Sequence, residues 1–300
     1  MIALSTAWVG AERETVEDTV RRATEVGFRA FEIGAWGAVP RAQTLVALAR
    51  ELDIAYTSVH NISYRDNVPA DEVFGDGLSS SDKEARRRAI EATVETAGLA
   101  REIGAKFVIV HAGQVEIPEA REKRSEARRL YAAGQRDEAR RFTAHCMTER
   151  GALAAPAVEA AAASLAEVFR RTGGFPMAVE SRDHYHSIPQ PGEFDFMTKV
   201  LSGRPLYYWH DVGHARIGEL LGLPCALSWL DAFGEILAGV HFHDMQGLRD
   251  HKVPGTGDVD FTQFAPYLRE KTIRVMELGP FYSAEQLVEG RKHLEAAGIA

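Results

Sequence analysis

The chain has 300 residues, of which 45% are hydrophobic and 26% charged, and this ordinary globular balance argues against a disordered or fibrous protein. Its 35 basic and 43 acidic residues give a net charge of −8, which argues against a protein that binds the phosphate backbone of nucleic acids. The two cysteines, Cys146 and Cys225, are too few for a disulfide framework or a cysteine-based zinc site. The positions of the eleven histidines are therefore the feature to follow.

No segment has the pattern of an export signal or a membrane span. The start of the chain, MIALSTAW, lacks a basic lead and is typical of a strand. The most apolar long stretch, 152–163, contains Pro156 and Glu159 and is shorter than the roughly 20 residues that a membrane-spanning helix needs. We therefore expect a soluble cytoplasmic protein with no membrane contact.

Short β-rich runs alternate with longer helical segments along the whole chain. Some runs, such as FVIV at 107–110, are apolar on both faces, which is typical of strands covered by helices on one side and a packed core on the other. The predicted strands are 2–8, 30–34, 55–61, 106–112, 176–181, 206–212, 238–245 and 273–278. The predicted helices, marked by apolar stripes and glycine stops, are 15–26, 82–103, 155–171, 227–237, 262–269 and 284–297.

This alternation predicts an α/β fold, a single (β/α)8 TIM barrel that spans residues 1–300 as one domain. An open doubly wound sheet is the alternative, but no G-x-G-x-x-G turn follows the first strand. The segment 117–150, after the fourth strand, is predicted to be a helical insertion with nine basic and six acidic residues. It is either a solvated helical hairpin, a lid over the pocket or a contact of a homodimer.

Imidazole or carboxylate groups stand at the ends of six successive predicted strands. In a TIM barrel these C-terminal ends surround one mouth. Burying so many ionisable groups together without a cation would cost several kcal/mol for each uncompensated charge, and a divalent metal removes that cost. The sequence therefore predicts a metal site. The groups are His60, His111, Glu180, Asp211, His214, His241, His243, Asp244 and Glu277, with His251 shortly after the seventh strand.

Local patterns indicate which of these side chains point inward. Strand alternation places His241 and His243 on one face, toward the barrel, and Asp244 on the other, where it supports a neighbour. Gly213 is expected to permit a sharp turn that brings His214 back over the mouth.

Six motifs in this order resemble one superfamily, the xylose isomerase-like TIM barrels. It includes sugar isomerases and epimerases, inosose dehydratases and endonuclease IV-type enzymes. The motifs are VHNISY at 59–64, VHAG at 110–113, HDVGHA at 210–215, VHFHD at 240–244, DHKVPGTGDVDF at 250–261 and MELG at 276–279.

The resemblance implies two kinds of metal site. In the single-metal epimerases and isomerases, the matching residues would hold Mn2+, Mg2+, Zn2+ or Co2+, and His214 would contact the substrate. In the trinuclear zinc endonucleases, further ligands match His60, His111, His214 and His251. The four ligands of the single-metal site would be Glu180, Asp211, His241 and Glu277.

One position departs from the trinuclear pattern. An aspartate is expected two residues before His251, but Arg249 stands there, and Asp250 would need a shifted register. A complete third zinc site is therefore not expected, whereas a second metal at His60 and His111 stays open. Arg249 either meets an anionic group of the substrate or lies on the surface.

The resemblance implies a reaction on a small polyol, ketose or sugar phosphate. Glu180 and Glu277 would remove and return a proton beside a metal-chelated carbonyl through an enediolate, which isomerises or epimerises the substrate. Loss of a β-hydroxyl group would instead make a dehydratase. An endonuclease IV-like phosphodiesterase, or a binding or regulatory protein without chemistry, would also fit the same strand-end residues.

Further substrate contacts are predicted around the mouth. His186 and His251 are candidate proton carriers or hydroxyl contacts. Trp8 and Trp36 are candidates for an apolar wall against a sugar, with a place in the core as the alternative. Glu32 either binds hydroxyl groups or pairs with an arginine.

Overall fold

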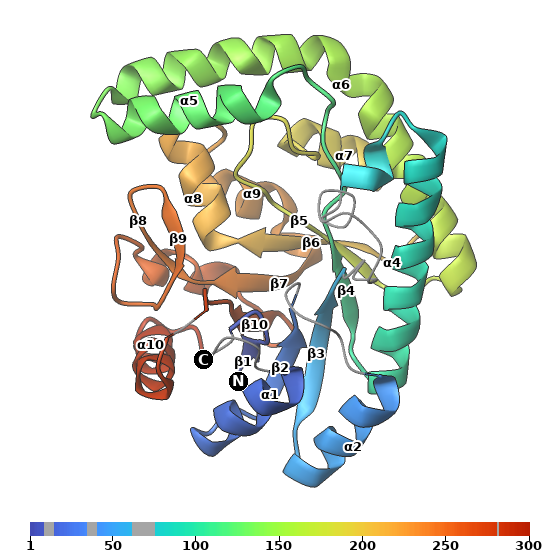
Figure 1. Cartoon of the computed structure of the whole chain (residues 1–300), viewed down its shortest axis with the longest axis vertical. Helices are drawn as coiled ribbons and strands as arrows, with labels where there is room; N and C mark the ends of the chain where they lie inside the picture. Colours follow the sequence, from blue (N-terminus) through green and yellow to red (C-terminus); the bar gives the residue numbers. More distant parts are fainter. Residues whose placement is uncertain (9–14, 35–40, 62–75, 281) are drawn as a thin grey trace.

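The computed structural model describes residues 1–8, 15–34, 41–61, 76–280 and 282–300. Eight parallel strands close into a barrel in the order β1-β10-β7-β6-β5-β4-β3-β2, so the predicted fold class is confirmed (Figure 1). The strands are β1 (Ile2–Ser5), β2 (Ala30–Ile33), β3 (Ala55–His60), β4 (Phe107–Val110), β5 (Met177–Glu180), β6 (Leu206–Asp211), β7 (Leu237–Phe242) and β10 (Ile273–Met276).

Helices surround the barrel and begin and end at sequence signals. α1 starts at Thr15, whose side chain accepts a hydrogen bond from the backbone of Asp18 in a capping box. α4 starts at Asp82 and ends at Gly104, which has a left-handed backbone. The helices in this layer are α1 (Val16–Glu25), α2 (Ala42–Leu52), α4 (Lys83–Ile103), α6 (Arg136–Thr172), α7 (Pro191–Val200), α8 (Val212–Leu220), α9 (Ala226–Phe233) and α10 (Ala284–Ala296).

Several predicted elements differ in the structure, among them the strand predicted at 2–8, which ends at Ser5. The segment 262–269 forms two 3-10 turns, because the ring of Pro266 would clash with the preceding turn of a continuous α-helix. The predicted strand 238–245 ends at Phe242, and a separate hairpin follows, formed by β8 (Asp244–Gln246) and β9 (Arg249–Lys252). The helix predicted at 227–237 ends at Phe233, and α2, α7 and α8 were not predicted.

The insertion is not separate from the helix that follows it. α5 (Ala120–Ala132) lies beside the first half of α6 across one end of the barrel (Figure 1), and α6 continues without a break to Thr172. The predicted helix 155–171 is thus the second half of a 37-residue helix. Pro156 is tolerated within it because Ala152, whose carbonyl loses its hydrogen bond, is exposed to water.

Trp209 fills the interior of the barrel below the mouth. The ring is completely buried and is surrounded by small inward-facing residues, among them Ala178 and Ala238. A Cβ atom on Gly239 would lie 2.3 Å from the Trp209 ring, so only glycine fits there. The ring centroid of His241 lies 5.2 Å from that of Trp209. Trp209 therefore forms an apolar floor beneath the histidines and carboxylates of the mouth.

α6 is long and apolar enough by composition to span a membrane, contrary to the expectation from the sequence, although 44% of the relevant window is buried within the protein. Its apolar residues Val158, Leu165 and Phe169 are buried in the core around the barrel. A core helix satisfies the same criterion, so the composition of α6 is explained by this packing. The cytoplasmic location stays a prediction.

A buried ion pair connects α6 to α7. The guanidinium of Arg150, 3% exposed, donates hydrogen bonds to both carboxylate oxygens of Glu193, at 2.5 and 2.7 Å, and to the carbonyl of Ser187 at 2.9 Å. Replacing Arg150 would leave the Glu193 carboxylate without its cationic partner, and losses of this kind in buried pairs typically cost about 3–5 kcal/mol.

We expect Arg150→Met to lower the free energy of unfolding by about 3 kcal/mol in urea denaturation followed by circular dichroism. Arg170→Met, which breaks an exposed pair with Glu167 on the same helix, is the control and should change it by less than about 1 kcal/mol. Equal effects of the two substitutions would contradict a structural role for the buried pair.

Candidate metal centre and active site

Three carboxylates converge on one nitrogen of His241 at the mouth of the barrel. The Nδ1 atom lies 3.2 Å from Oε1 of Glu180, 3.6 Å from Oδ2 of Asp211 and 3.2 Å from Oε2 of Glu277. All four residues are buried, and their ligand atoms lie within 4.8 Å of one another. These are the four residues that the resemblance assigned to a single metal, and the fold brings them together from β5, β6, β7 and the end of β10.

The opposite nitrogen of His241 is held by Glu32. Its Nε2 atom lies 3.1 and 3.2 Å from the two carboxylate oxygens of Glu32, and the Ser58 hydroxyl donates to the same carboxylate at 2.8 Å. A histidine that ligates a metal commonly donates its other ring N–H to a carboxylate. Glu32 therefore holds the ring so that Nδ1, the atom that would ligate a metal, faces the three carboxylates. Glu32 is completely buried, so its partners are within the protein rather than on a substrate hydroxyl or an arginine.

The carboxylates keep their charge despite burial. Burial would raise the pKa of Glu180, but Arg182 and His111 outweigh it and hold the pKa well below its usual range. His214 and His243 have the same effect on the pKa of Asp211. The site thus concentrates negative charge that a cation can neutralise.

A second group of possible ligands shares Glu180. Its Oε2 atom lies 2.6 Å from Nε2 of His111 and 3.4 Å from Nε2 of His60. Burial lowers the pKa of His111 to about 4, and the charge of Arg182 contributes. His111 is therefore neutral at pH 7 and can offer a lone pair. The Nδ1 atom of His60 has no hydrogen-bond partner among the described residues.

Asp250 completes a third group, contrary to the expectation from the sequence. Its carboxylate lies 3.7 Å from Nε2 of His214 and 3.2 Å from Nδ1 of His251. Two features of the hairpin explain this position: the pairing of β8 with β9 shifts register, and His251 has a left-handed backbone with φ 53°. Asp250 thus stands near both histidines although Arg249 occupies the expected position.

Arg182 lies between the second and third groups and was not predicted. Its Nη1 atom lies 3.0 Å from Nε2 of His111, 3.3 Å from Oε2 of Glu180 and 3.4 Å from Nδ1 of His214. Its place two residues after Glu180, on the same side of an extended segment, was the available signal. The guanidinium supplies positive charge to this side of the site.

His243 contacts the carboxylate of Asp211 through one ring nitrogen. Its Nε2 atom lies 3.0 and 3.1 Å from the two oxygens of Asp211, and its Nδ1 atom accepts a hydrogen bond from the backbone of His251. Gly213 is needed for this contact rather than for a turn, since it lies inside α8 and a Cβ atom there would be 2.1 Å from the His243 ring. The prediction of a sharp glycine turn is wrong: Asp211 caps α8 by accepting a hydrogen bond from the backbone of His214.

Asp244 holds the loop that follows the β8–β9 hairpin. Its two carboxylate oxygens accept hydrogen bonds from the backbone N–H groups of Gly255, Gly257 and Val259 at 2.8–3.0 Å. A Cβ atom on Gly257 would lie 2.1 Å from a backbone oxygen. This glycine therefore allows the loop of the DHKVPGTGDVDF motif to close around Asp244, outside the metal groups.

The remaining predicted contacts lie outside these groups. His186 is buried beside the mouth and lines a cavity under α5. Arg249 is exposed at the start of β9. Trp8 has no exposed surface and stacks against Arg22, contrary to its predicted role in a substrate wall. Trp36 lies outside the described residues.

Sequence comparison agrees with this combination of barrel and strand-end ligands. The sequence matches the family model described as xylose isomerase-like TIM barrel over residues 20–171, just over half of the chain, and the protein belongs to this family. No curated protein matches the chain.

Several solved structures share the fold at low sequence identity. A D-tagatose 3-epimerase-like protein has a TM-score of 0.67 at 15% identity, covering 99% of this chain and 96% of its own. D-psicose 3-epimerase from Clostridium cellulolyticum has a TM-score of 0.68 at 13% identity, with 99% of both chains covered. Endonuclease IV from Thermus thermophilus has a TM-score of 0.60 at 17% identity, covering 99% of this chain and 97% of its own. These similarities establish the barrel.

We expect Gly213→Ala to lower the free energy of unfolding by about 1–3 kcal/mol, because the new methyl group must displace the His243 ring from Asp211. Gly151→Ala is the matched control: it also lies inside a helix, has no atom within 4 Å of the new Cβ and should stabilise by roughly 0.5–1 kcal/mol. Urea denaturation measures both, and a neutral Gly213→Ala would show that His243 can move freely.

Proposed function

We propose that this protein is a divalent-metal-dependent sugar or sugar-phosphate isomerase or epimerase. The observation that supports it most directly is the convergence of Glu180, Asp211 and Glu277 on Nδ1 of His241, with Glu32 fixing the opposite nitrogen. Three carboxylates and one imidazole suit Mn2+, Mg2+, Zn2+ or Co2+. The fold shared with sugar epimerases adds to this reading.

The chemistry follows from the placement of two carboxylates. A divalent ion in this group would polarise the carbonyl of a bound ketose and make the neighbouring C–H more acidic. Glu180 and Glu277 extend from strands that are not neighbours in the barrel, and each has an oxygen 3.2 Å from His241. We assign one to remove the proton and the other to return it, which epimerises the carbon beside the carbonyl. Departure of a β-hydroxyl group from the same enediolate would make the enzyme a dehydratase.

Arg182 favours one ion over several. Its guanidinium contacts His111, Glu180 and His214, which belong to the second and third groups. A cation among those ligands would be repelled unless Arg182 moved away. Arg182 contacts the four-residue group around His241 only at Oε2 of Glu180, whereas Oε1 of Glu180 faces His241, so we assign this group the essential metal.

Removing the metal should lower the thermal stability of the protein. Chelation would leave the buried carboxylates without the ion, and an ion present at about 100 times its Kd adds about 2.7 kcal/mol of stability. We expect Mn2+, Mg2+, Zn2+ or Co2+ to raise the Tm of chelator-treated protein, and Asp211→Asn to reduce this rise. Glu289→Gln, a change in an exposed pair with Lys292, is the control and should keep it. Absence of any metal-dependent shift in the wild type would contradict the metal site.

The reaction is tested by exchange with solvent. In D2O, the wild type should introduce deuterium at the carbon beside the carbonyl of one member of a panel of ketoses, inososes and ketose phosphates. NMR measures this incorporation. Glu180→Gln and Glu277→Gln should each lower the rate by at least about 100-fold, as expected for loss of an acid–base group. Loss of water from the substrate would identify the dehydratase, and unchanged exchange in both variants would contradict the assigned roles.

A phosphodiesterase is the second candidate, favoured by one observation. Asp250 stands with His214 and His251 in one of four possible ligand groups among the described residues, and a carboxylate beside these two histidines resembles the ligand pattern of the trinuclear endonucleases. Cleavage of DNA at abasic sites by zinc-loaded protein, lost in Asp250→Asn, together with no exchange on the sugar panel, would favour this function over the first.

A further inference from the structure

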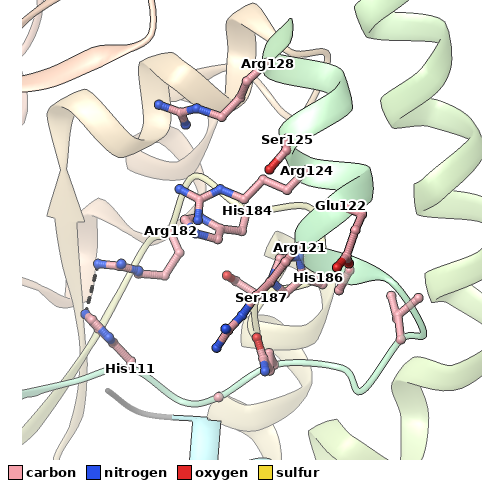
Figure 2. Close-up of a pocket in the computed structure, with 14 residues that line it drawn as sticks. His111, Arg121, Glu122, Arg124, Ser125, Arg128, Arg182, His184, His186 and Ser187 are labelled. Atoms are coloured by element: carbon pink, nitrogen blue, oxygen red, sulfur yellow. Dashed lines mark hydrogen bonds between the residues drawn. The ribbon is translucent and has the colours of Figure 1, made fainter. Parts of the chain in front are cut away.

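A cavity of about 930 Å³ lies between the barrel mouth and the insertion helix α5. Figure 2 shows Arg121 and Arg124 of α5 reaching across it toward the loop after β5, which carries His184, His186 and Ser187. His111 and Arg182 line its inner end, and both contact Glu180 of the metal group. The cavity therefore opens directly onto the proposed reaction site.

The α5 wall of this cavity is built from arginines on one helical face. Arg121, Arg124 and Arg128 are spaced by three and four residues, so they point the same way from the helix. With Arg182 they place four guanidinium groups around the cavity, whereas Glu122 is the one carboxylate among the described lining residues. Arg129, on another face of α5, is exposed and paired with Glu126.

Several nitrogen atoms around the cavity lack partners among the described residues. Arg121 is exposed to solvent and makes no hydrogen bond or ion pair with them, whereas Nε of Arg124 and Nδ1 of His186 are buried without a partner. Asp183 contacts only part of this charge, at 3.4 Å from Arg124 and 3.2 Å from Arg128. A buried N–H such as Nε of Arg124 is normally satisfied, so its unpaired state indicates a missing acceptor.

We propose that this arginine pocket, formed by Arg121, Arg124, Arg128 and Arg182, binds the phosphate group of a phosphorylated sugar or polyol whose carbonyl reaches the His241 group. The inference deepens the proposed function and rests on it for the position of the reacting carbon. Guanidinium groups suit the geometry and charge of a phosphate ester, which carries close to two negative charges at neutral pH. Arg182 joins the two regions, since it contacts Glu180 and lines the pocket.

The dimensions favour a small ligand over a polynucleotide. A volume of about 930 Å³ is within the range of small-molecule sites, and α5 forms a wall over the mouth. The other basic side chains of α5 are paired, Arg129 with Glu126 and Lys123 with Glu149. Among the basic side chains of α5, Arg121 has no ion pair with a described residue, and it lines the pocket.

Calorimetric titration of inorganic phosphate into chelator-treated full-length protein tests the pocket without the metal. We expect Arg121→Gln and Arg124→Gln to weaken binding at least about tenfold, which corresponds to about 1.4 kcal/mol. Arg129→Gln is the control on the same helix and should bind as the wild type does. Because Arg121 has no partner to lose among the described residues, its variant should keep the wild-type Tm, which verifies folding.

A second titration compares D-fructose 6-phosphate with D-fructose. The wild type should bind the phosphate ester at least about tenfold more tightly, and Arg121→Gln should remove this difference. Phosphate binding that requires added metal, equal binding in all variants, or no binding at millimolar phosphate would overturn the proposal. An abasic duplex that competes for the same Arg121-dependent site would assign the pocket to a DNA backbone instead.

The two proposals fail separately. If Glu180→Gln leaves deuterium exchange unchanged while phosphate binding still depends on Arg121 and Arg124, the reaction assignment is wrong and the anion pocket stands. If exchange depends on Glu180 but phosphate binding ignores the arginines, the pocket assignment is wrong and the reaction stands.

Discussion

The mutual repulsion of three buried carboxylates is the constraint around which this protein is organised. Glu180, Asp211 and Glu277 meet at one nitrogen of His241, above the apolar floor of Trp209. Burial would raise the pKa of each carboxyl, and the surrounding cations outweigh that effect. Arg182, His214 and His251 supply positive charge, the two histidines because nearby carboxylates raise their pKa, and a divalent cation would supply more where the carboxylates converge.

The insertion after β4 adds a helical wall with several arginines to the mouth of the barrel. α5 and α6 are joined to the barrel wall by one continuous helix and by the buried pair of Arg150 with Glu193. This anchoring holds the arginine face of α5 over the cavity. The most basic part of an acidic chain thus lies next to its most acidic cluster, and Arg182 lies between them. Such a division suits a substrate with an anionic end and a reacting end.

Strand ends and motifs were predictable because they are local. A barrel places the C-terminal ends of its strands around one mouth, so the order of Glu180, Asp211, His241 and Glu277 along the chain indicated one cluster. The position of Asp250 was not predictable, since it depends on a register shift and on the left-handed backbone of His251. The reason for Gly213 was also missed, because the His243 ring that approaches it comes from a distant part of the chain.

The sequence by itself determined the barrel, the strands that carry the ligands and the identity of the four residues around the proposed metal. Those features follow from periodicity, from the rule that parallel strands share an end and from the motifs of the family. Only the tertiary structure decided that Glu32 lies behind His241, that Arg182 stands between the ligand groups and that the α5 arginines face a cavity. These are contacts between side chains distant in the chain, and their partners are selected by packing rather than by spacing.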